Sequence, residues 1–143
     1  MASAIIYQDD EGNLIIVRPI VHIDMVLSKD IPQTAKNIVI IDDTMIPEDR
    51  TFRDAWEIKG KNLIINMDKA KAILLDRIRQ VRNIKLDLLD KDWMAAYGQG
   101  KTQLASQIEA QRQVLRDIPQ TINLNAAANA DELKAIWPFE SME

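Results

Sequence analysis

One stretch of the chain matches a loose phosphate-binding pattern, since Ala95 to Thr102 reads AAYGQGKT. In such a loop, backbone N–H groups surround the phosphates, a lysine reaches the terminal phosphate and a hydroxyl binds Mg²⁺. Lys101 and Thr102 would have these roles in a nucleotide hydrolase. However, a phosphate loop follows a buried parallel strand, whereas residues 90–94 are helix-like and Ala95 stands where the first glycine belongs. We therefore predict a turn between two helices here, and no enzyme activity.

Few residues are suited to metal binding or to nucleophilic catalysis. The chain has no cysteine and a single histidine, His22, so zinc sites and histidine-based triads lack their parts. The acidic run Asp9 to Glu11 is not followed by the terminal glutamate that a calcium loop needs. We predict no metal and no cofactor, and we expect His22 to be a half-buried packing residue.

Composition narrows the class of protein further. The 143 residues are 47% hydrophobic and carry a formal net charge of −4. This is enough apolar material for one or two small domains, and an acidic chain is a poor candidate for general nucleic-acid binding. The chain has neither an apolar run of membrane-spanning length nor the opening of a secretion signal. We expect a cytoplasmic protein that binds neither nucleic acid nor membrane.

Residues 1–66 read as a small β-rich module. Two runs rich in β-branched residues flank a turn in which Gly12 is free to take a positive φ, which predicts a hairpin over residues 4–18. The further elements predicted are a helical turn at 23–28, a strand at 37–41, and a second hairpin pairing 55–58 with 63–66 across 59–62.

The periodicity becomes helical from residue 67 onward. It predicts a helix from about Asp68 to about Tyr97, with one apolar stripe that includes Ala70, Leu74, Ile78 and Leu88. The remaining predictions are a break at 98–100, a helix from 102 to 116 capped by Thr102 and ended or kinked at Pro119, and a last turn at 132–136 capped by Asp131. The fold class is α+β: a β-hairpin-rich module over 1–66, followed by a helical hairpin over 67–143.

Three tryptophans are the largest apolar side chains of the protein. Such residues anchor cores and also dominate interface hot spots. We expect Trp56 and Trp93 in the core. Trp137 lies near the end of the sequence, where it either holds the last turn in place or contacts a partner.

Two segments of the helical part carry a resemblance to a known family. Residues 86–93, LDLLDKDW, look like a helix ending in Leu-x-x-x-Asp-Trp, and residues 111–120, QRQVLRDIPQ, closely resemble a Tyr-Arg-Gln-x-Leu-Arg-Asp-Ile-Pro signature. Trp137-Pro138 matches a Trp-Pro pair near the end, and residues 47–56 resemble a segment of tail-associated phage proteins. The chain thus resembles the phage tail assembly chaperone family. It departs from the pattern at Gln111 and in the connection over 94–110.

The resemblance implies a non-enzymatic phage protein that binds and assists assembly of the tail or tail fibre. The alternative is a structural tail or tail-fibre component retained in the virion, so its location is the host cytoplasm or the virion tail. The partner is a tail or tail-fibre protein, and a homo-oligomer would complete the small cores. Client binding would use open hairpin edges, by strand addition, or the helical hairpin. The candidate partner-binding residues are Trp93, Arg112, Arg116, Asp117 and Trp137.

Overall fold

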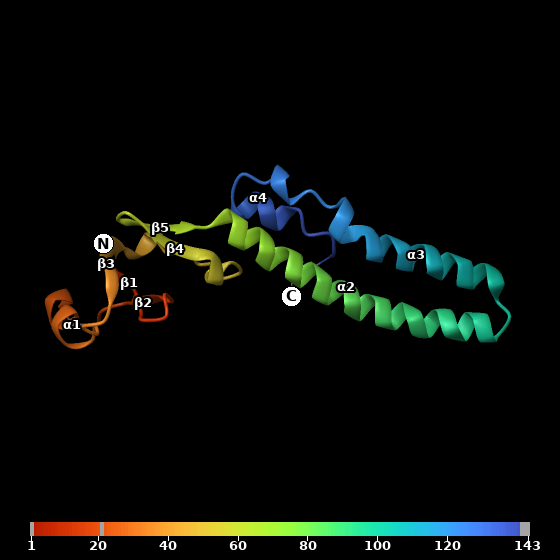
Figure 1. The fold of residues 1–143 in the computed structure, drawn as a ribbon, viewed down its shortest axis with the longest axis horizontal. Helices are drawn as coiled ribbons and strands as arrows, with labels where there is room; N and C mark the ends of the chain where they lie inside the picture. The colour runs from red at the N-terminus through yellow and green to blue at the C-terminus, as the bar shows by residue number, and fades with distance from the viewer. Residues whose placement is uncertain (1, 21, 141–143) are drawn as a thin grey trace. The chain divides into compact units, whose positions relative to one another are not determined.

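The computed structural model describes residues 2–20 and 22–140 (Figure 1). The chain forms two compact units, Met1–Met67 and Asp68–Glu143. The first contains antiparallel β-sheets and the second a long helical hairpin, so the fold is α+β, as predicted.

The first unit contains a three-stranded antiparallel sheet in the order β2-β1-β3. The central strand β1 (Ser3–Gln8) pairs with β2 (Leu14–Val17) on one edge and with β3 (Lys36–Asp42) on the other. The hairpin predicted over residues 4–18 is confirmed, and Gly12 has a positive φ of 83° in its turn. Because both edges of β1 are paired, only β2 and β3 are edge strands of this sheet.

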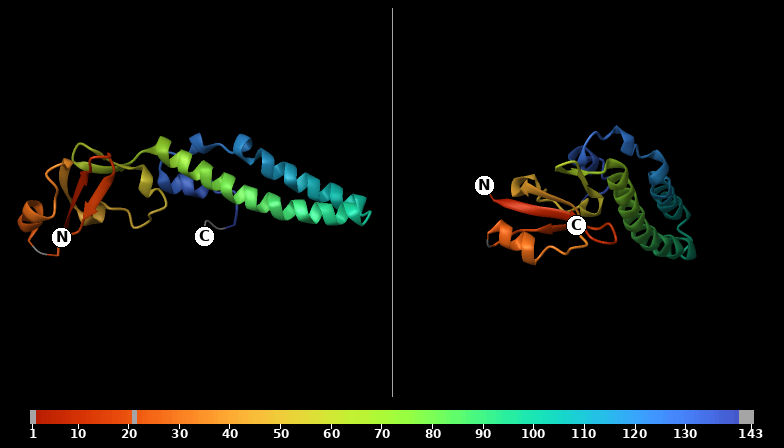
Figure 2. Two further views of the ribbon diagram at one scale, coloured as in Figure 1. Left: turned by 60° about the horizontal axis from the view of Figure 1, so that its bottom comes forward. Right: turned by 60° about the vertical axis from the view of Figure 1, so that its left-hand side comes forward.

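The strand β1 is buried on both faces as well. Alternate side chains of a strand point to opposite faces, so Ala4 and Ile6 enter one apolar cluster and Ile5 and Tyr7 another. The first cluster joins the sheet to β4 and β5, and the second joins it to helix α1 (Ile23–Lys29). Figure 2 shows α1 and the β4·β5 hairpin on opposite sides of β1. This double burial explains why β1 reads as an uninterrupted apolar run.

The second predicted hairpin is confirmed with a shorter turn. β4 (Trp56–Lys59) and β5 (Asn62–Ile65) pair antiparallel, and only two residues, including Gly60 at φ 63°, connect them. Trp56 is buried, as expected of a core residue. Two short 3₁₀ helices precede this hairpin, η1 (Asp43–Met45) and η2 (Arg53–Ala55).

The expectation that His22 is half-buried is wrong. Its side chain is 71% exposed and stands at the N-terminus of α1, where Nδ1 accepts a hydrogen bond from the backbone N–H of Asp24 at 3.3 Å. The imidazole accepts from an N–H group that has no partner within the helix, so the ring lies at the exposed N-terminus of α1.

The second unit is built on α2 (Met67–Gly98) and α3 (Thr102–Thr121), followed by the 3₁₀ helix η3 (Leu124–Ala126) and α4 (Ala130–Ala135). The predicted long helix is confirmed within one residue at each end. Short α4 lies beside the first half of α2 in both figures. There Ala70, Leu74 and Ile78 of α2 and Leu133 of α4 are buried. The predicted apolar stripe stops before Leu88, which is 58% exposed.

The helix α3 runs past the predicted end at Pro119. Proline lacks an N–H, so in this position it removes one hydrogen bond to the carbonyl four residues earlier. The helix nevertheless closes one more turn, since the N–H of Ile122 donates to Ile118 O at 3.0 Å. Because proline in the last turn removes only this one bond, the helix continues past Pro119 and ends at Thr121.

Both predicted N-caps in the second unit are wrong by one or two residues. The cap of α3 is Lys101, without a side-chain hydrogen bond, and Thr102 is already helical. The cap of α4 is Asn129, whose Oδ1 accepts from the backbone N–H of Glu132 at 2.9 Å. Asp131 lies within the first turn instead, where its negative charge suits the helix dipole.

Candidate functional site

A tight turn of residues 99–101 joins α2 to α3 and brings the two helices together. Gly100 has a φ of 72°, and its N–H donates to Tyr97 O at 3.0 Å. The N–H of Lys101 donates to Ala96 O at 2.9 Å. These amides satisfy carbonyl groups at the end of α2 rather than facing outward as phosphate ligands. The predicted turn between two helices is confirmed.

The helices meet near the turn through small side chains. Ala96 of α2 and Ala105 and Ile108 of α3 are buried, and Leu89 and Trp93 pack against them. Alanines allow two helix backbones to approach closely. Trp93 lies at the edge of this core rather than inside it, because it is half-buried.

Arg112 of α3 lies at the centre of a charged and aromatic cluster. Its guanidinium is 5.4 Å from the ring centroid of Trp93, its Nε is 2.8 Å from Asp90 Oδ1, and its Nη1 donates to Glu109 Oε2 at 2.7 Å. Glu109 Oε1 also accepts from Arg116 Nη1 at 2.8 Å. The Arg112 side chain is only 17% exposed. We call these five residues the Arg112 cluster; its members come from both helices.

Two members of the Arg112 cluster, Glu109 and Arg116, shift each other's pKa. The hydrogen bond from Arg116 is the main cause that lowers the pKa of Glu109, and the same bond raises the pKa of Arg116. The Nε–H of Arg112 is not aligned with Asp90, so that contact is an ion pair and not a hydrogen bond. Both shifts favour the charged forms of Glu109 and Arg116.

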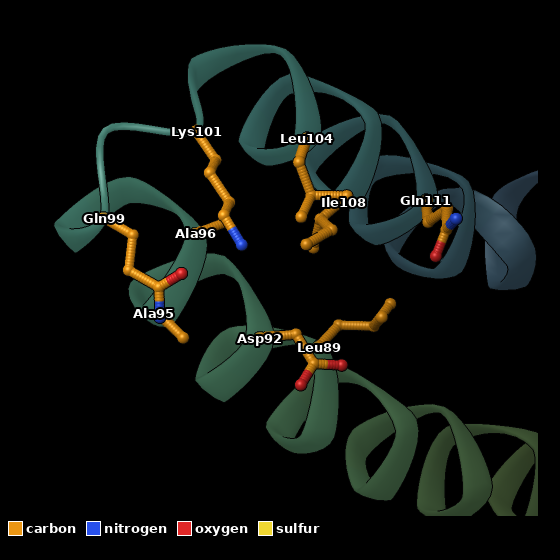
Figure 3. Close-up of a pocket in the computed structure, with 9 residues that line it drawn as sticks. All are labelled: Leu89, Asp92, Ala95, Ala96, Gln99, Lys101, Leu104, Ile108 and Gln111. Carbon is orange, nitrogen blue, oxygen red and sulfur yellow. The ribbon is translucent and has the colours of Figure 1, made fainter.

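A groove runs between α2 and α3 and is apolar over most of its length. It consists of two adjoining hollows that share Leu89 and Gln111. The hollow nearest the turn is drawn in Figure 3, where the Lys101 side chain extends from the turn into it. We call the whole the apolar groove; its lining residues are Lys85, Leu88, Leu89, Asp92, Ala95, Ala96, Gln99, Lys101, Leu104, Ile108, Gln111, Val114 and Leu115.

The structure brings together three of the five residues predicted to bind a partner. Trp93, Arg112 and Arg116 belong to the Arg112 cluster. Asp117 accepts a hydrogen bond from Gln113 Nε2 at 2.9 Å, one turn earlier on the same helix. Trp137 packs edge-on against Phe139 with ring centroids 5.2 Å apart.

Sequence reasoning missed the acidic partners and the groove. Neither Asp90 nor Glu109 was among the predicted partner-binding residues, although Glu109 stands three residues before Arg112, a spacing at which helical side chains meet. Of the groove residues, Val114 is 65% exposed and Leu104 is 44% exposed. The sequence shows only that Leu104 and Val114 are apolar residues of the predicted helix, and their exposure follows from the structure.

The strand β3 presents a second surface, in the first unit. It pairs with β1 on one edge, and its other edge has no strand partner among the residues that the structure describes. Ile38 is 47% exposed and Ile40 is 49% exposed. An edge strand with exposed apolar side chains is a template for pairing with another strand.

Residues 2–20 and 22–140 show neither a metal-binding cluster nor a membrane-spanning helix. They contain no group of three or more histidine, cysteine or acidic side chains placed to hold a metal ion. Within the same residues, no helix combines the length and apolar character that crossing a membrane requires. The two surface features of the described residues are therefore the apolar groove of the second unit and the unpaired edge of β3 in the first.

Comparison with protein-family models, curated proteins and solved structures finds no match to this chain. The resemblance to the phage tail assembly chaperone family therefore rests on the residues quoted for it. Its two best segments, 86–93 and 111–120, lie on α2 and α3 and meet where Arg112 lies over Trp93.

Proposed function

We propose that this is a non-enzymatic phage protein that binds a tail or tail-fibre protein and assists its assembly, with the free edge of β3 as the client-binding site. The resemblance of residues 86–93 and 111–120 supports the biological role. The observation that carries the binding mode is the unpaired, partly apolar edge of β3. Tail fibres are rich in β-structure, and their unpaired strands aggregate before they assemble.

The backbone of β3 offers hydrogen-bonding groups to such a strand. Asp43 N–H donates to Ala2 O at 2.9 Å, and the pairing then runs through Ile41 opposite Ala4. Because the hydrogen-bonding direction alternates along an antiparallel strand, the N–H and C=O of Ile40 face away from β1. These groups are available for strand addition, in which main-chain bonds supply affinity and side chains supply specificity.

The edges that the sequence indicated are less suited to this role. The outer edge of β1 in the 4–18 hairpin is occupied by β3. The edge strand β2 has only four residues, and its Leu14 carbonyl accepts a hydrogen bond from Arg53 Nη2 at 2.6 Å. β3 has seven residues and a longer apolar edge. The second hairpin that the sequence indicated, over residues 55–66, also has strands of only four residues each, β4 and β5, so we assign strand addition to β3.

The test is co-expression with the tail-fibre protein of the same phage, followed by affinity capture and by mass spectrometry of finished particles. Ile40→Pro removes an outward-facing N–H and leaves the β1–β3 ladder intact, so it is expected to weaken capture at least tenfold. Met94→Lys is the matched control, since Met94 is an exposed apolar residue of α2. Circular dichroism confirms that both variants are folded.

Each result has a distinct meaning. Capture by the wild type, loss with Ile40→Pro and absence from particles support the proposal. Equal capture by Ile40→Pro and the wild type rejects β3 as the site. Presence in particles at a fixed copy number favours the structural alternative, and no capture together with no incorporation rejects both roles.

A further inference from the structure

The apolar groove leaves large apolar side chains in water. Leu88 is 58% exposed and Val114 is 65% exposed, while the cluster buried between the helices near the turn contains only three residues. Two-helix hairpins commonly cover such a face by pairing with two further helices in a four-helix bundle. The groove therefore resembles the inner face of such a bundle without the helices that would cover it.

Charged side chains in the α2 wall of the groove are arranged in a directional order. Lys85 lies at one end, Asp92 lies seven residues further along the helix, and Leu88 and Leu89 lie between them. At 1.5 Å per residue, the two charges are separated by about 10 Å along the axis. Lys85 is also in contact with the chain's own Phe139, whose ring centroid is 5.5 Å from Nζ. Lys101 lies beyond Asp92, at the tip of the hairpin.

The α3 wall has a matching order. Gln111 lines both hollows, with apolar residues before it and after it. Leu104 and Ile108 precede it, and Val114 and Leu115 follow it. The groove is thus apolar on both sides of a midpoint near Leu88 and Gln111.

We propose that the occupant of the apolar groove is the same groove of a second copy of this chain, related by a two-fold axis near Leu88 and Gln111. A two-fold interface uses one patch twice, in opposite directions. The antiparallel arrangement places Lys85 of each copy opposite Asp92 of the other, and packs the apolar residues before Gln111 against those after it. In a parallel two-fold arrangement, α2 of one copy would instead face α3 of the other, whose groove-lining residues carry no charge, so Lys85 and Asp92 would have no opposite charge across the interface.

This interface is separate from the β3 edge, so its test needs no client. Sedimentation equilibrium on the full chain is expected to show a dimer at micromolar concentration. Val114→Asp places a charge in the groove and is expected to give a monomer with unchanged helix content. Met94→Asp is the control on α2, because Met94 is 68% exposed and does not line the groove; it is expected to remain a dimer.

Charge reversal tests the antiparallel direction. Lys85→Asp and Asp92→Lys are each expected to raise the dimer dissociation constant at least tenfold, because each creates two like-charge contacts across the axis. The double variant exchanges the charges and is expected to restore dimerisation. This rescue separates the contact between copies from loss of the Lys85–Phe139 contact, which the double variant does not restore.

Because the chain contains no cysteine, a single introduced cysteine can locate the two-fold axis by disulfide cross-linking. Leu88→Cys is expected to form a disulfide-linked dimer on mild oxidation, whereas Met94→Cys is expected to stay largely unlinked. A wild type that is monomeric at all concentrations would overturn the proposal. So would a dimer that survives Val114→Asp, a double variant that fails to rescue, or equal cross-linking through both cysteines.

Discussion

The guanidinium of Arg112 lies over the ring of Trp93, with 5.4 Å between its central carbon and the ring centroid, and thereby joins α3 to α2. The same side chain forms ion pairs with Asp90 across the hairpin and with Glu109 on its own helix. A planar cation can stack on a ring and pair with carboxylates at its edge at the same time. Arg112 thus makes one polar link between the two helices outside the small alanine-rich core.

Replacing Arg112 tests the strength of this link. Arg112→Ala is expected to lower the free energy of unfolding of the second unit by about 1–2 kcal/mol, because it removes the cation–π contact and partly exposed ion pairs. Arg112→Lys should lose roughly half of that, since it keeps the charge without the planar stack. Urea unfolding followed by circular dichroism at 222 nm measures both. Arg79→Ala, on an exposed part of α2, is the control and should change stability by less than about 0.5 kcal/mol.

The Glu109–Arg116 pair predicts a stability that depends on pH. The hydrogen bond from Arg116 holds the pKa of Glu109 below its usual value of 4.5, so in acid the unfolded chain binds more protons than the folded one. The stabilisation is complete above the usual value and is lost as the pH falls through the lowered pKa. Unfolding curves between about pH 3 and 7 should therefore show the wild type and Glu109→Gln converging in acid. A constant difference between them across that range would contradict this assignment.

Gly98 at the end of α2 and Gly100 in the turn after it differ in backbone conformation, so alanine is expected to have different effects at the two positions. Gly100 has a positive φ, and a side chain in that conformation costs about 1–2 kcal/mol, so Gly100→Ala should destabilise the hairpin by that amount. Gly98 is the last residue of α2, and an added Cβ meets no atom within 4 Å. Gly98→Ala should be neutral or stabilise by up to about 1 kcal/mol, because alanine favours helix. The midpoint of thermal unfolding orders the two variants, and the reverse order would show that the turn differs from that described.

Burial distinguishes two isoleucines on the same helix. Ile78 is fully buried, whereas Ile84 is 63% exposed. Ile78→Ala leaves a cavity and should cost about 2–5 kcal/mol. Ile84→Ala should change stability by less than about 0.5 kcal/mol, since surface substitutions have small effects. Urea midpoints compare the two, and similar losses at both positions would mean that Ile84 is covered in solution.

Much of the fold could be predicted because its elements have strong local signals. Two runs rich in β-branched residues around a turn predict the hairpin over residues 4–18, and the helical period after residue 67 predicts α2. The errors concern positions where tertiary context decides. Pro119 is predicted to end or kink the helix, but it falls in the last turn of α3, where its missing N–H removes only one bond. The helical turn predicted at 23–28 is present as α1, but His22 caps its N-terminus and is exposed rather than half-buried.

The candidate site was harder to predict, because it depends on which helix faces meet. The resemblance singled out Arg112 and Trp93, and they are in contact. Their acidic partner Asp90 lies on the other helix from Arg112, so only the register of α2 against α3 identifies it. Leu88 continues the apolar period of α2, yet α4 covers only the first half of that helix and leaves Leu88 exposed. Periodicity identifies an apolar face but not how far a neighbouring element extends along it.

The central position of β1 has a consequence for folding during synthesis. A ribosome releases the chain from its N-terminus, so β1 and β2 emerge together while β3, which ends at Asp42, is still to come. During that interval β1 has one unpaired edge, and the later residues of both its apolar clusters are not yet present. An exposed apolar strand edge is prone to aggregation in a nascent chain. The first unit is therefore most vulnerable early in translation, whereas α2 and α3 pair through contacts between neighbouring elements, which form quickly once α3 has emerged.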